Sequence, residues 1–257
     1  MVRPEHRAGS DQLADARGMA HPAGSAAPAG RIGGMMTDPG SPAEVIAQLE
    51  ALANPEHKAS TAKRIPEELV IGVRMREVFD LAKRARDLPL ADVRTLLRHE
   101  LYEPRLVAVC ILDFRARLKR ISEDERRGLY ELYLAEHDHI DSWDLVDRAA
   151  PRVIGGYVVG KDPEPLYALA QHPSTWRRRT AITAAFTLIR AGELDAPVRL
   201  IDLLLDDPEH FVQTSVGVAL RELNRASPKR CEEFLAGNRD RLSSTTKRLM
   251  RDSRRSS

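Results

Sequence analysis

From Ser41 to about Met250, apolar residues recur at the three- and four-residue spacing of amphipathic α-helices. The connections between these segments are short and contain Pro, Gly or Asp, and no segment shows the clear alternation of a β-strand. The pattern therefore predicts an all-α protein. The clearest helical segments are residues 75–85, 106–118, 126–137, 179–192 and 215–226.

Two of these segments repeat at a distance of 35 residues. The shift aligns three apolar positions of each helix: Ala181 with Val216, Ala185 with Leu220, and Leu188 with Leu223. It also places Trp176 on Phe211 and His172-Pro173 on Asp207-Pro208. Helix pairs that repeat every 30 to 50 residues are typical of α-solenoids, HEAT repeats among them. We therefore predict an α-solenoid of HEAT-like repeats.

Trp143 precedes Trp176 by 33 residues, and each tryptophan follows a hydroxyl residue. The apolar positions after Trp143 do not superpose at this shift, which indicates an irregular copy of the repeat. The two tryptophans are nevertheless predicted to occupy similar places in successive repeats and to face the same concave surface.

The ends of the chain differ in composition from the helical part. Residues 1–36 are rich in Ala, Gly and Pro without a period, and such a segment buries too little apolar surface to offset the entropy of ordering. An alternative is that the natural chain begins at Met35 or Met36. The sequence "SPAE" at 41–44 is a capping box with Pro at the first helical position. We expect a disordered tail over 1–40, a folded domain over 41–251 and a basic tail over 252–257.

The composition of the 257-residue chain narrows its cellular setting. The net charge is only +2, but arginine outnumbers lysine and clusters late in the sequence. Cys110 and Cys231, the two cysteines, lie inside apolar helical patterns, which favours a reduced intracellular protein. No apolar run approaches the roughly 20 residues of a membrane span, and no long apolar stretch marks a secretory signal. We expect a cytoplasmic protein that does not bind membranes.

Trp143 and Asp147 place an aromatic ring and a carboxylate on one face of a predicted helix, because residues four apart are neighbours. Pro151 has no N–H to donate to the carbonyl of Asp147, so this turn is expected to be opened or kinked. An aromatic face beside a carboxylate is a receptor for a cation. The alternative is an ordinary helix N-terminus in which Trp143 is buried filler.

Trp176 is followed by three arginines, Arg177, Arg178 and Arg179, and residues 174–190 contain four arginines and no acid. A helix with such a charge suits contacts with phosphate groups. The alternative is a solvated face whose arginines pair with acids on neighbouring helices.

Other signals are weaker. The basic C-terminal segment includes Lys247 and Arg248, but basic tails are common. The "HDH" at 137–139 lacks a third metal ligand at helical spacing and favours a surface loop. Phosphate-binding loops, dinucleotide fingerprints and nucleophile elbows are missing from the sequence.

Together these segments resemble the AlkD-type family of DNA alkylation-repair proteins, which are HEAT-like glycosylases. The resemblance runs from "NPEHKASTAKR" through "IGVRMREVFDLAK", "SWDLVD" and "STWRRRTAI" to "FVQTSVGVALREL". It implies a concave, basic groove that holds duplex DNA, and hydrolysis of the N-glycosidic bond of cationic N3- or N7-alkylated purines without a metal or redox cofactor. The expected protein is a nucleoid-associated monomer whose partner is duplex DNA with alkylated bases.

The resemblance also implies roles for single residues. Trp143 and Asp147 match the family's aromatic residue and catalytic carboxylate, Arg179 matches an active-site arginine that would grip the adjacent phosphate, and Arg221 in "ALRE" matches a basic residue near the site. The remaining expected DNA contacts are Trp176, Arg177, Arg178, Lys247 and Arg248.

Two positions depart from the family pattern. Val218 stands where active relatives have a second tryptophan, and "LSSTT" at 242–246 replaces a segment that contains a DNA-contacting arginine. These departures favour a rival interpretation, a non-enzymatic DNA-binding solenoid. A protein-binding solenoid is a third possibility. Asp147 favours the enzyme, because a protein that only binds phosphates gains nothing from a carboxylate in the groove.

Overall fold

The computed structural model describes residues 37–252, and the predicted tails before and after this range lie outside the described residues. Residues 37–40 have no regular structure, and every regular element that follows in the described range is helical. The α-helices are α1 (Pro42–Ala51), α2 (Pro55–Thr61), α3 (Met75–Arg84), α4 (Leu90–Leu97), α5 (Tyr102–Ala116), α6 (Glu123–Ala135), α7 (Trp143–Ala150), α8 (Gly156–Val158), α9 (Glu164–Ala170), α10 (Thr175–Arg190), α11 (Asp195–Leu204), α12 (His210–Ala226), α13 (Pro228–Asn238) and α14 (Ser244–Asp252). Short 3₁₀ turns lie at Glu67–Leu69, His137–His139 and Arg239–Arg241, and a π-helical turn lies at Pro151–Gly155.

The first helix begins where the capping box predicts. The Ser41 hydroxyl accepts a hydrogen bond from the Glu44 N–H at 3.3 Å, and Pro42 is the first helical residue. In a capping box the Glu44 carboxylate would accept from the N–H of the cap residue, Ser41. Here it accepts from the N–H of the preceding residue, Gly40, at 2.8 Å. The folded unit thus has a defined N-terminal end.

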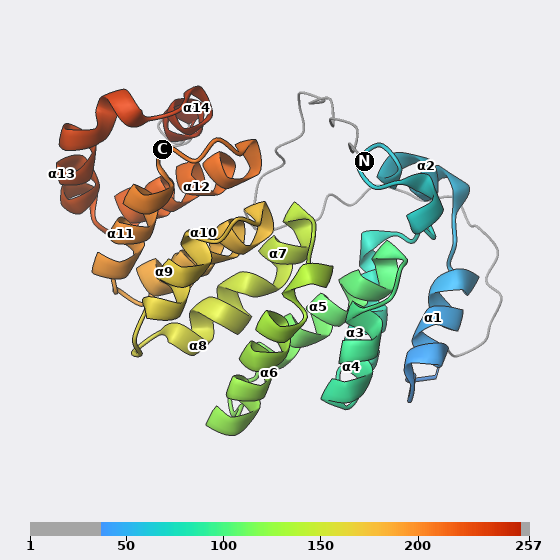
Figure 1. The fold of residues 1–257 in the computed structure, drawn as a ribbon. Helices are drawn as coiled ribbons and strands as arrows, with labels where there is room; N and C mark the ends of the chain where they lie inside the picture. The colour runs from blue at the N-terminus through green and yellow to red at the C-terminus, as the bar shows by residue number, and fades with distance from the viewer. Residues whose placement is uncertain (1–36, 253–257) are drawn as a thin grey trace, which may run out of the picture. The chain divides into compact units, whose positions relative to one another are not determined.

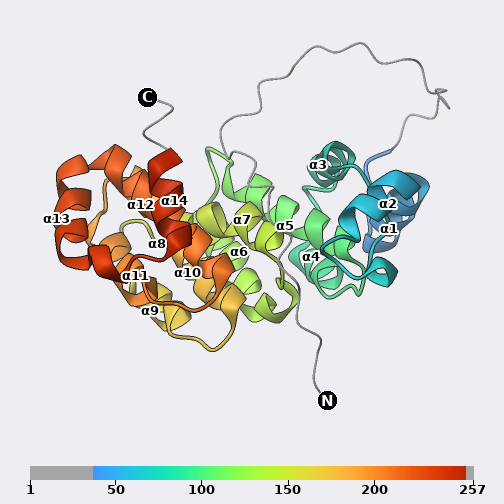
Figure 2. The same ribbon diagram turned by 90° about the horizontal axis from the view of Figure 1, so that it is seen from above.

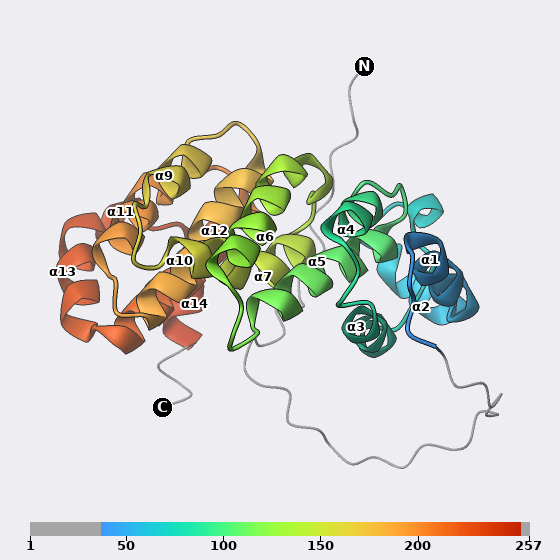
Figure 3. The ribbon, with the colours of Figure 1, turned by 90° about the horizontal axis from the view of Figure 1, so that it is seen from below.

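The helices pack in two layers, in chain order (Figures 1 and 2). One layer is formed by α3, α5, α7, α10, α12 and α14, each in contact with the next. In the other layer α4 contacts α6, and α9 contacts α11 (Figure 3). Apolar residues from both layers form one continuous core. This arrangement confirms the predicted all-α solenoid. None of the helices between residues 37 and 252 is long and apolar enough to cross a membrane.

The 35-residue period is visible in the helix boundaries. Helix α10 begins at Thr175 and α12 begins at His210, which is 35 residues later. The rings of Trp176 and Phe211, also 35 apart, contact each other with centroids at 5.2 Å. The aligned core positions are all fully buried: Ala181, Ala185 and Leu188 in α10, and Val216, Leu220 and Leu223 in α12.

Buried positions 35 residues apart also relate α7 to α10. A shift of 35 lays Val146 on Ala181, Ala150 on Ala185, and Val153 on Leu188, and all six residues are buried. The shift of 33 aligned two tryptophans instead of two apolar cores. The starts of α7 and α10 are 32 residues apart, so Trp143 is the first residue of its helix and Trp176 is the second. That the two tryptophans occupy similar places stays a prediction.

Pro151 changes the course of the third copy, as its missing N–H predicts. Helix α7 ends at Ala150 and continues as the π-helical turn. This turn packs very closely on α10: a Cβ added to Gly155 would lie 2.3 Å from the carbonyl oxygen of Ala184. The Thr187 hydroxyl donates a hydrogen bond to the Pro151 carbonyl in the same contact. Only glycine fits at residue 155.

We therefore expect Gly155→Ala to destabilise the protein. The added methyl group must push α10 away from the π-helical turn, and overpacking of this kind lowers the free energy of unfolding by about 1–3 kcal/mol or more. Urea denaturation of the two proteins measures the difference. Gly237→Ala in α13 is the matched control, because nothing lies within 4 Å of the added atom. Alanine should stabilise that helix by up to about 1 kcal/mol. A Gly155 variant as stable as the wild type would contradict the close packing.

Candidate functional site

Asp147 and Arg179 form a two-pronged ion pair that joins α7 to α10. The Arg179 Nε donates to one carboxylate oxygen at 2.9 Å, and Nη2 donates to the other at 2.7 Å. The Nη1 group donates to the backbone carbonyl of Phe211, at the start of α12. Such paired donors fix both the position and the plane of the carboxylate. Asp147 is therefore held by the two repeats that follow it.

The two partners differ in exposure. The side chain of Asp147 keeps 38% of its surface exposed, whereas that of Arg179 keeps 5%. Each of the three nitrogen atoms of the Arg179 guanidinium donates to Asp147 or to the Phe211 carbonyl, and its contact with a phosphate stays a prediction. Asp147 remains accessible to a ligand. Arg179 positions the carboxylate.

The environment of Asp147 opposes its charge. Loss of solvent around the carboxyl group raises its pKa above the usual value, and the guanidinium of Arg179 counteracts this rise. The negative charge of Asp144, one helical turn away, adds to the rise. The carboxylate is thus less hydrated than a surface aspartate and interacts more strongly with a nearby cation.

Trp143 lies at the first position of α7, one helical turn before Asp147. The alternative is correct in that α7 begins here, with Ser142 as its N-cap, but Trp143 is 40% exposed and is not buried filler. The guanidinium of Arg64 lies over the indole ring at 5.8 Å from the ring centroid. Arg64 also forms an ion pair with Asp144, which gives α7 a second anion beside the ring. The sequence correctly predicted that Trp143 and Asp147 lie close together, but it did not indicate that Arg64 contacts the ring.

Arg177 and Arg178 point to acidic partners. Arg177 pairs with Asp138 at 3.0 Å, and Arg178 pairs with Asp207 at 2.6 Å. Arg178 also donates to the carbonyls of residues 172 and 173, which closes the turn before α10. The alternative interpretation, in which these arginines pair with acids of neighbouring elements, therefore describes the contacts of Arg177 and Arg178. Their role in DNA binding remains a prediction.

Trp176 is partly buried and packs on Phe211. Its contacts differ from those of Trp143, whose ring lies under Arg64. The concave surface predicted to hold both tryptophans also remains a prediction.

Helices α12 and α14 carry the other predicted DNA contacts. Arg221 is partly exposed, and its buried Nε has no hydrogen-bond partner within residues 37–252. Lys247 and Arg248 are exposed on α14. A Cβ at Gly217 would lie 2.7 Å from Leu249, so the two helices are in close contact. These three cations belong to two packed helices, and the side chains of Lys247 and Arg248 are exposed.

Sequence reasoning missed an arginine row that follows the repeat period. Arg117 and Arg152 are 35 residues apart, as are Arg190 and Arg225. The fully buried carboxylate of Asp113 accepts ion pairs from Arg117 at 2.6 Å, Arg148 at 3.2 Å and Arg152 at 3.4 Å. Glu222 accepts ion pairs from Arg190 at 3.2 Å and from Arg225 at 2.9 Å. Five arginines thus share two carboxylates, and a search for charges at the period could have found most of them.

The His137–His139 segment is not a surface loop. It forms a 3₁₀ turn in which His137 is buried, and the His137 Nε2 lies 2.9 Å from the Thr180 hydroxyl in α10. Tyr133 contacts the same hydroxyl at 3.0 Å. Burial lowers the pKa of His137 from 6.5 to about 4. Within the described range, no group of three or more His, Cys, Asp or Glu side chains is arranged to hold a metal ion.

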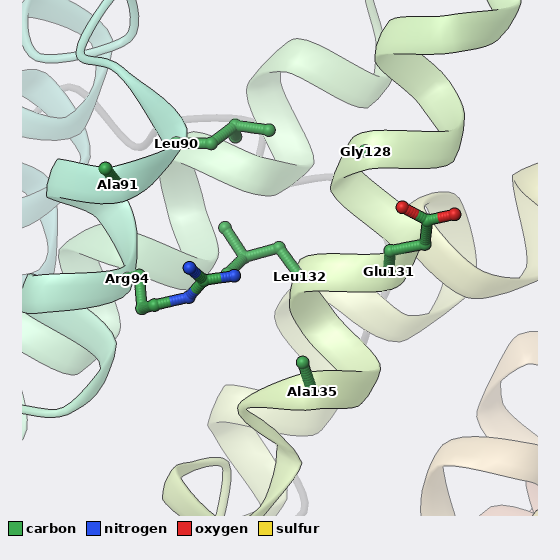
Figure 4. A pocket seen from close by; sticks show the side chains of 7 residues that line it. All are labelled: Leu90, Ala91, Arg94, Gly128, Glu131, Leu132 and Ala135. Atoms are coloured by element: carbon green, nitrogen blue, oxygen red, sulfur yellow. The ribbon is translucent and has the colours of Figure 1, made fainter.

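A pocket between α4 and α6 lies apart from these residues. Leu90 and Leu132 contribute apolar walls, and Arg94 and Glu131 lie at its edge (Figure 4). None of its lining residues is a candidate site residue.

Comparisons with known proteins agree with the resemblance read from the sequence. The profile of a family described as DNA alkylation repair enzyme matches residues 45–249. No curated protein matches the chain. A solved structure, a predicted DNA alkylation repair enzyme from Enterococcus faecalis, has a similar fold with a TM-score of 0.60 at 20% identity. The alignment covers 77% of this chain and 94% of that one.

The burial of neutral His137 predicts a pH-dependent stability. Below pH 6.5 the unfolded state binds a proton that the folded state does not bind until about pH 4. The free energy of unfolding should therefore fall as the pH decreases through this window, by roughly 3 kcal/mol in total from this group. Urea denaturation at several pH values measures the slope. His137→Gln should flatten it, and equal slopes for the two proteins would contradict the assignment.

Proposed function

Because the chain belongs to the family of DNA alkylation repair enzymes, we propose that it is a DNA glycosylase that hydrolyses the N-glycosidic bond of cationic N3- or N7-alkylated purines in duplex DNA. The observation that carries this proposal is the accessible carboxylate of Asp147, held in position by the buried Arg179 and flanked by the exposed ring of Trp143. The coarser role, in the repair of alkylated DNA, follows from the family.

The proposed reaction needs few protein groups. An N3- or N7-alkylated purine is positively charged and leaves the sugar as a neutral base, so the leaving group needs little assistance. Breaking the bond develops positive charge on the sugar. A fixed carboxylate at this place stabilises the developing charge and orients or deprotonates the attacking water. Asp147 supplies this group, and the guanidinium of Arg179 prevents it from rotating.

Trp143 contributes to the same task by binding the cation. Its exposed ring lies one helical turn from Asp147, and aromatic rings attract cations that lie over their faces. Trp143 would hold the charged base or sugar while Asp147 acts on the bond. No metal or redox cofactor takes part in this mechanism.

The proposed DNA surface combines Arg221, Lys247 and Arg248 with the arginine row. Arg221, Lys247 and Arg248 are the predicted contacts best able to reach phosphates, because no acidic side chain pairs with them in the described structure. The arginine row adds an excess of positive charge over Asp113 and Glu222. Trp176, Arg177 and Arg178 would contribute after exchanging their present partners for phosphates. We propose that these groups line a concave, basic groove for duplex DNA and that the protein acts as a monomer on the nucleoid.

A second candidate function is DNA binding without catalysis. Val218 favours it, because a partly exposed aliphatic side chain lies three residues before Arg221, where the resemblance leads us to expect an aromatic ring. A binder of this kind would keep the basic surface and lose the excision step. The two functions therefore differ in one measurable quantity, the release of the base.

The first experiment measures the release of 7-methylguanine and 3-methyladenine from methylated duplex DNA. We expect the wild type to release them. Asp147→Asn removes the charge that stabilises the reacting sugar, and such a loss lowers the rate by about 100-fold or more. Binding to the duplex should persist. Asp138→Asn is the matched control, because Asp138 also pairs with an arginine of α10 but is far more exposed.

Folding must be checked in parallel, since Asp147→Asn leaves Arg179 buried beside an uncharged partner. Asp147→Glu keeps the charge and should be slowed less than Asp147→Asn. Robust excision by the Asn variant would refute the mechanism. Salt-sensitive DNA binding without excision by the wild type would favour the non-enzymatic function.

The second experiment tests the basic surface. Duplex affinity should fall steeply as the salt concentration rises, because bound phosphates release counterions. Arg152→Ala and Arg221→Ala should each weaken binding and reduce the salt slope by about one unit. Arg230→Ala in α13 removes an arginine outside this surface and is the control. An affinity that does not change with salt would favour a protein-binding solenoid.

A further inference from the structure

The ring of Trp143 is already covered by a cation of the protein itself. The guanidinium carbon of Arg64 lies 5.8 Å from the centroid of Trp143 and 5.1 Å from the centroid of Tyr102. Both distances are within the range of cation–π attraction. Arg64 therefore occupies the kind of place that the proposed function assigns to a charged base.

Arg64 is held there by an anion that other groups fix independently. Asp144 forms an ion pair with Arg64 and keeps only 9% of its side chain exposed. Its carboxylate also accepts hydrogen bonds from Ser142 Oγ at 2.6 Å and from the Leu145 N–H at 3.0 Å. Tyr102 donates its hydroxyl proton to the same carboxylate. The receptor formed by Trp143 and Asp144 thus has several supports besides Arg64.

The segment that carries Arg64 buries little surface, with Ile65 and Ile71 partly buried against the core. Helix α2 and the 3₁₀ turn Glu67–Leu69, which flank the loop containing Arg64, bury none of their residues. The base of the segment is fixed, because the Asn54 N–H donates to the Gly72 carbonyl at 2.9 Å. The buried carboxylate of Glu103 accepts from the Gly72 N–H at 2.8 Å and anchors the same point. A segment with a fixed base and little buried surface opens at low free-energy cost.

We propose that Arg64 acts as a tethered competitor for cationic ligands at the ring of Trp143. A cationic base binds to Trp143 only by taking the place of the Arg64 guanidinium, whose side chain is 33% exposed and can turn toward solvent. This inference rests on the proposed function, since it concerns the ligand of the same ring.

The charge of the ligand decides this competition. Two cations close to one ring repel each other, so the guanidinium and a charged base exclude one another. A charged base regains the attraction to Trp143 and to the carboxylates of Asp144 and Asp147. A neutral base regains much less, and Arg64 stays in place. Arg64 therefore competes with a charged base and much less with a neutral one, so it lowers the affinity of the ring for the charged base.

Binding of a nucleoside tests the proposal without catalysis. In a Trp176→Phe background, Trp143 is the remaining tryptophan, and its fluorescence reports on ligands at its ring. The probes are 7-methylguanosine, in weakly acidic buffer where it is a cation, and guanosine. Arg64→Ala and Arg64→Gln should bind 7-methylguanosine about 2- to 5-fold more tightly, the range that one exposed cation–π contact accounts for. Lys63→Ala removes the neighbouring exposed charge and should change nothing.

The expected gain is for the charged probe, so the ratio of its affinity to that of guanosine should rise in both Arg64 variants. Arg64→Gln keeps a hydrogen-bond donor for Asp144 and remains informative if the alanine variant unfolds. Unchanged or weaker binding of 7-methylguanosine by a folded Arg64 variant overturns the proposal, since the ring is then uncovered.

Excision separates this inference from the proposed function. If the wild type releases methylated bases but folded Arg64 variants bind the probe no better, the glycosylase assignment stands and the competitor role falls. If the Arg64 variants bind the charged nucleoside more tightly but no base is released, the cation site stands and the glycosylase assignment falls.

Discussion

The ion pair between Asp147 and Arg179 is the interaction on which the rest of the site depends. A buried guanidinium without an anion is very unfavourable, so the fold needs Asp147 as much as the proposed chemistry does. The third donor of Arg179 reaches the Phe211 carbonyl, and one side chain thereby connects α7, α10 and α12. Stability and the orientation of the carboxylate proposed to react arise from the same contacts.

The all-α solenoid could be predicted because apolar spacing and the 35-residue shift are properties of the sequence itself. The partners of the arginines could not. Arg177, Arg178 and Arg179 are consecutive, so their side chains point about 100° apart around α10, and each finds an acid from a different element: Asp138, Asp207 and Asp147. These acids lie 29 to 39 residues away. Only the packing of adjacent repeats decides which arginine is buried.

The candidate site was predicted in part, for a similar reason. Trp143 and Asp147 are four residues apart in one helix, so their proximity follows from helical geometry. Arg64 and Asp144 are 80 residues apart, and no local rule joins them. His137 was misplaced because a short polar sequence resembles a loop, whereas its ring is buried against Thr180.

Because Arg179 connects three helices, the alignment of Asp147 depends on all three being folded. In such folds each repeat is stabilised mainly by its neighbours, and unfolding can start at one end and advance repeat by repeat. The Phe211 carbonyl belongs to a helix near the C-terminal end of the described chain. Melting of that end removes a partner of Arg179 while α7 is still folded. The carboxylate would then lose its alignment first. A partly unfolded molecule would keep most of its helices and lose the proposed excision activity.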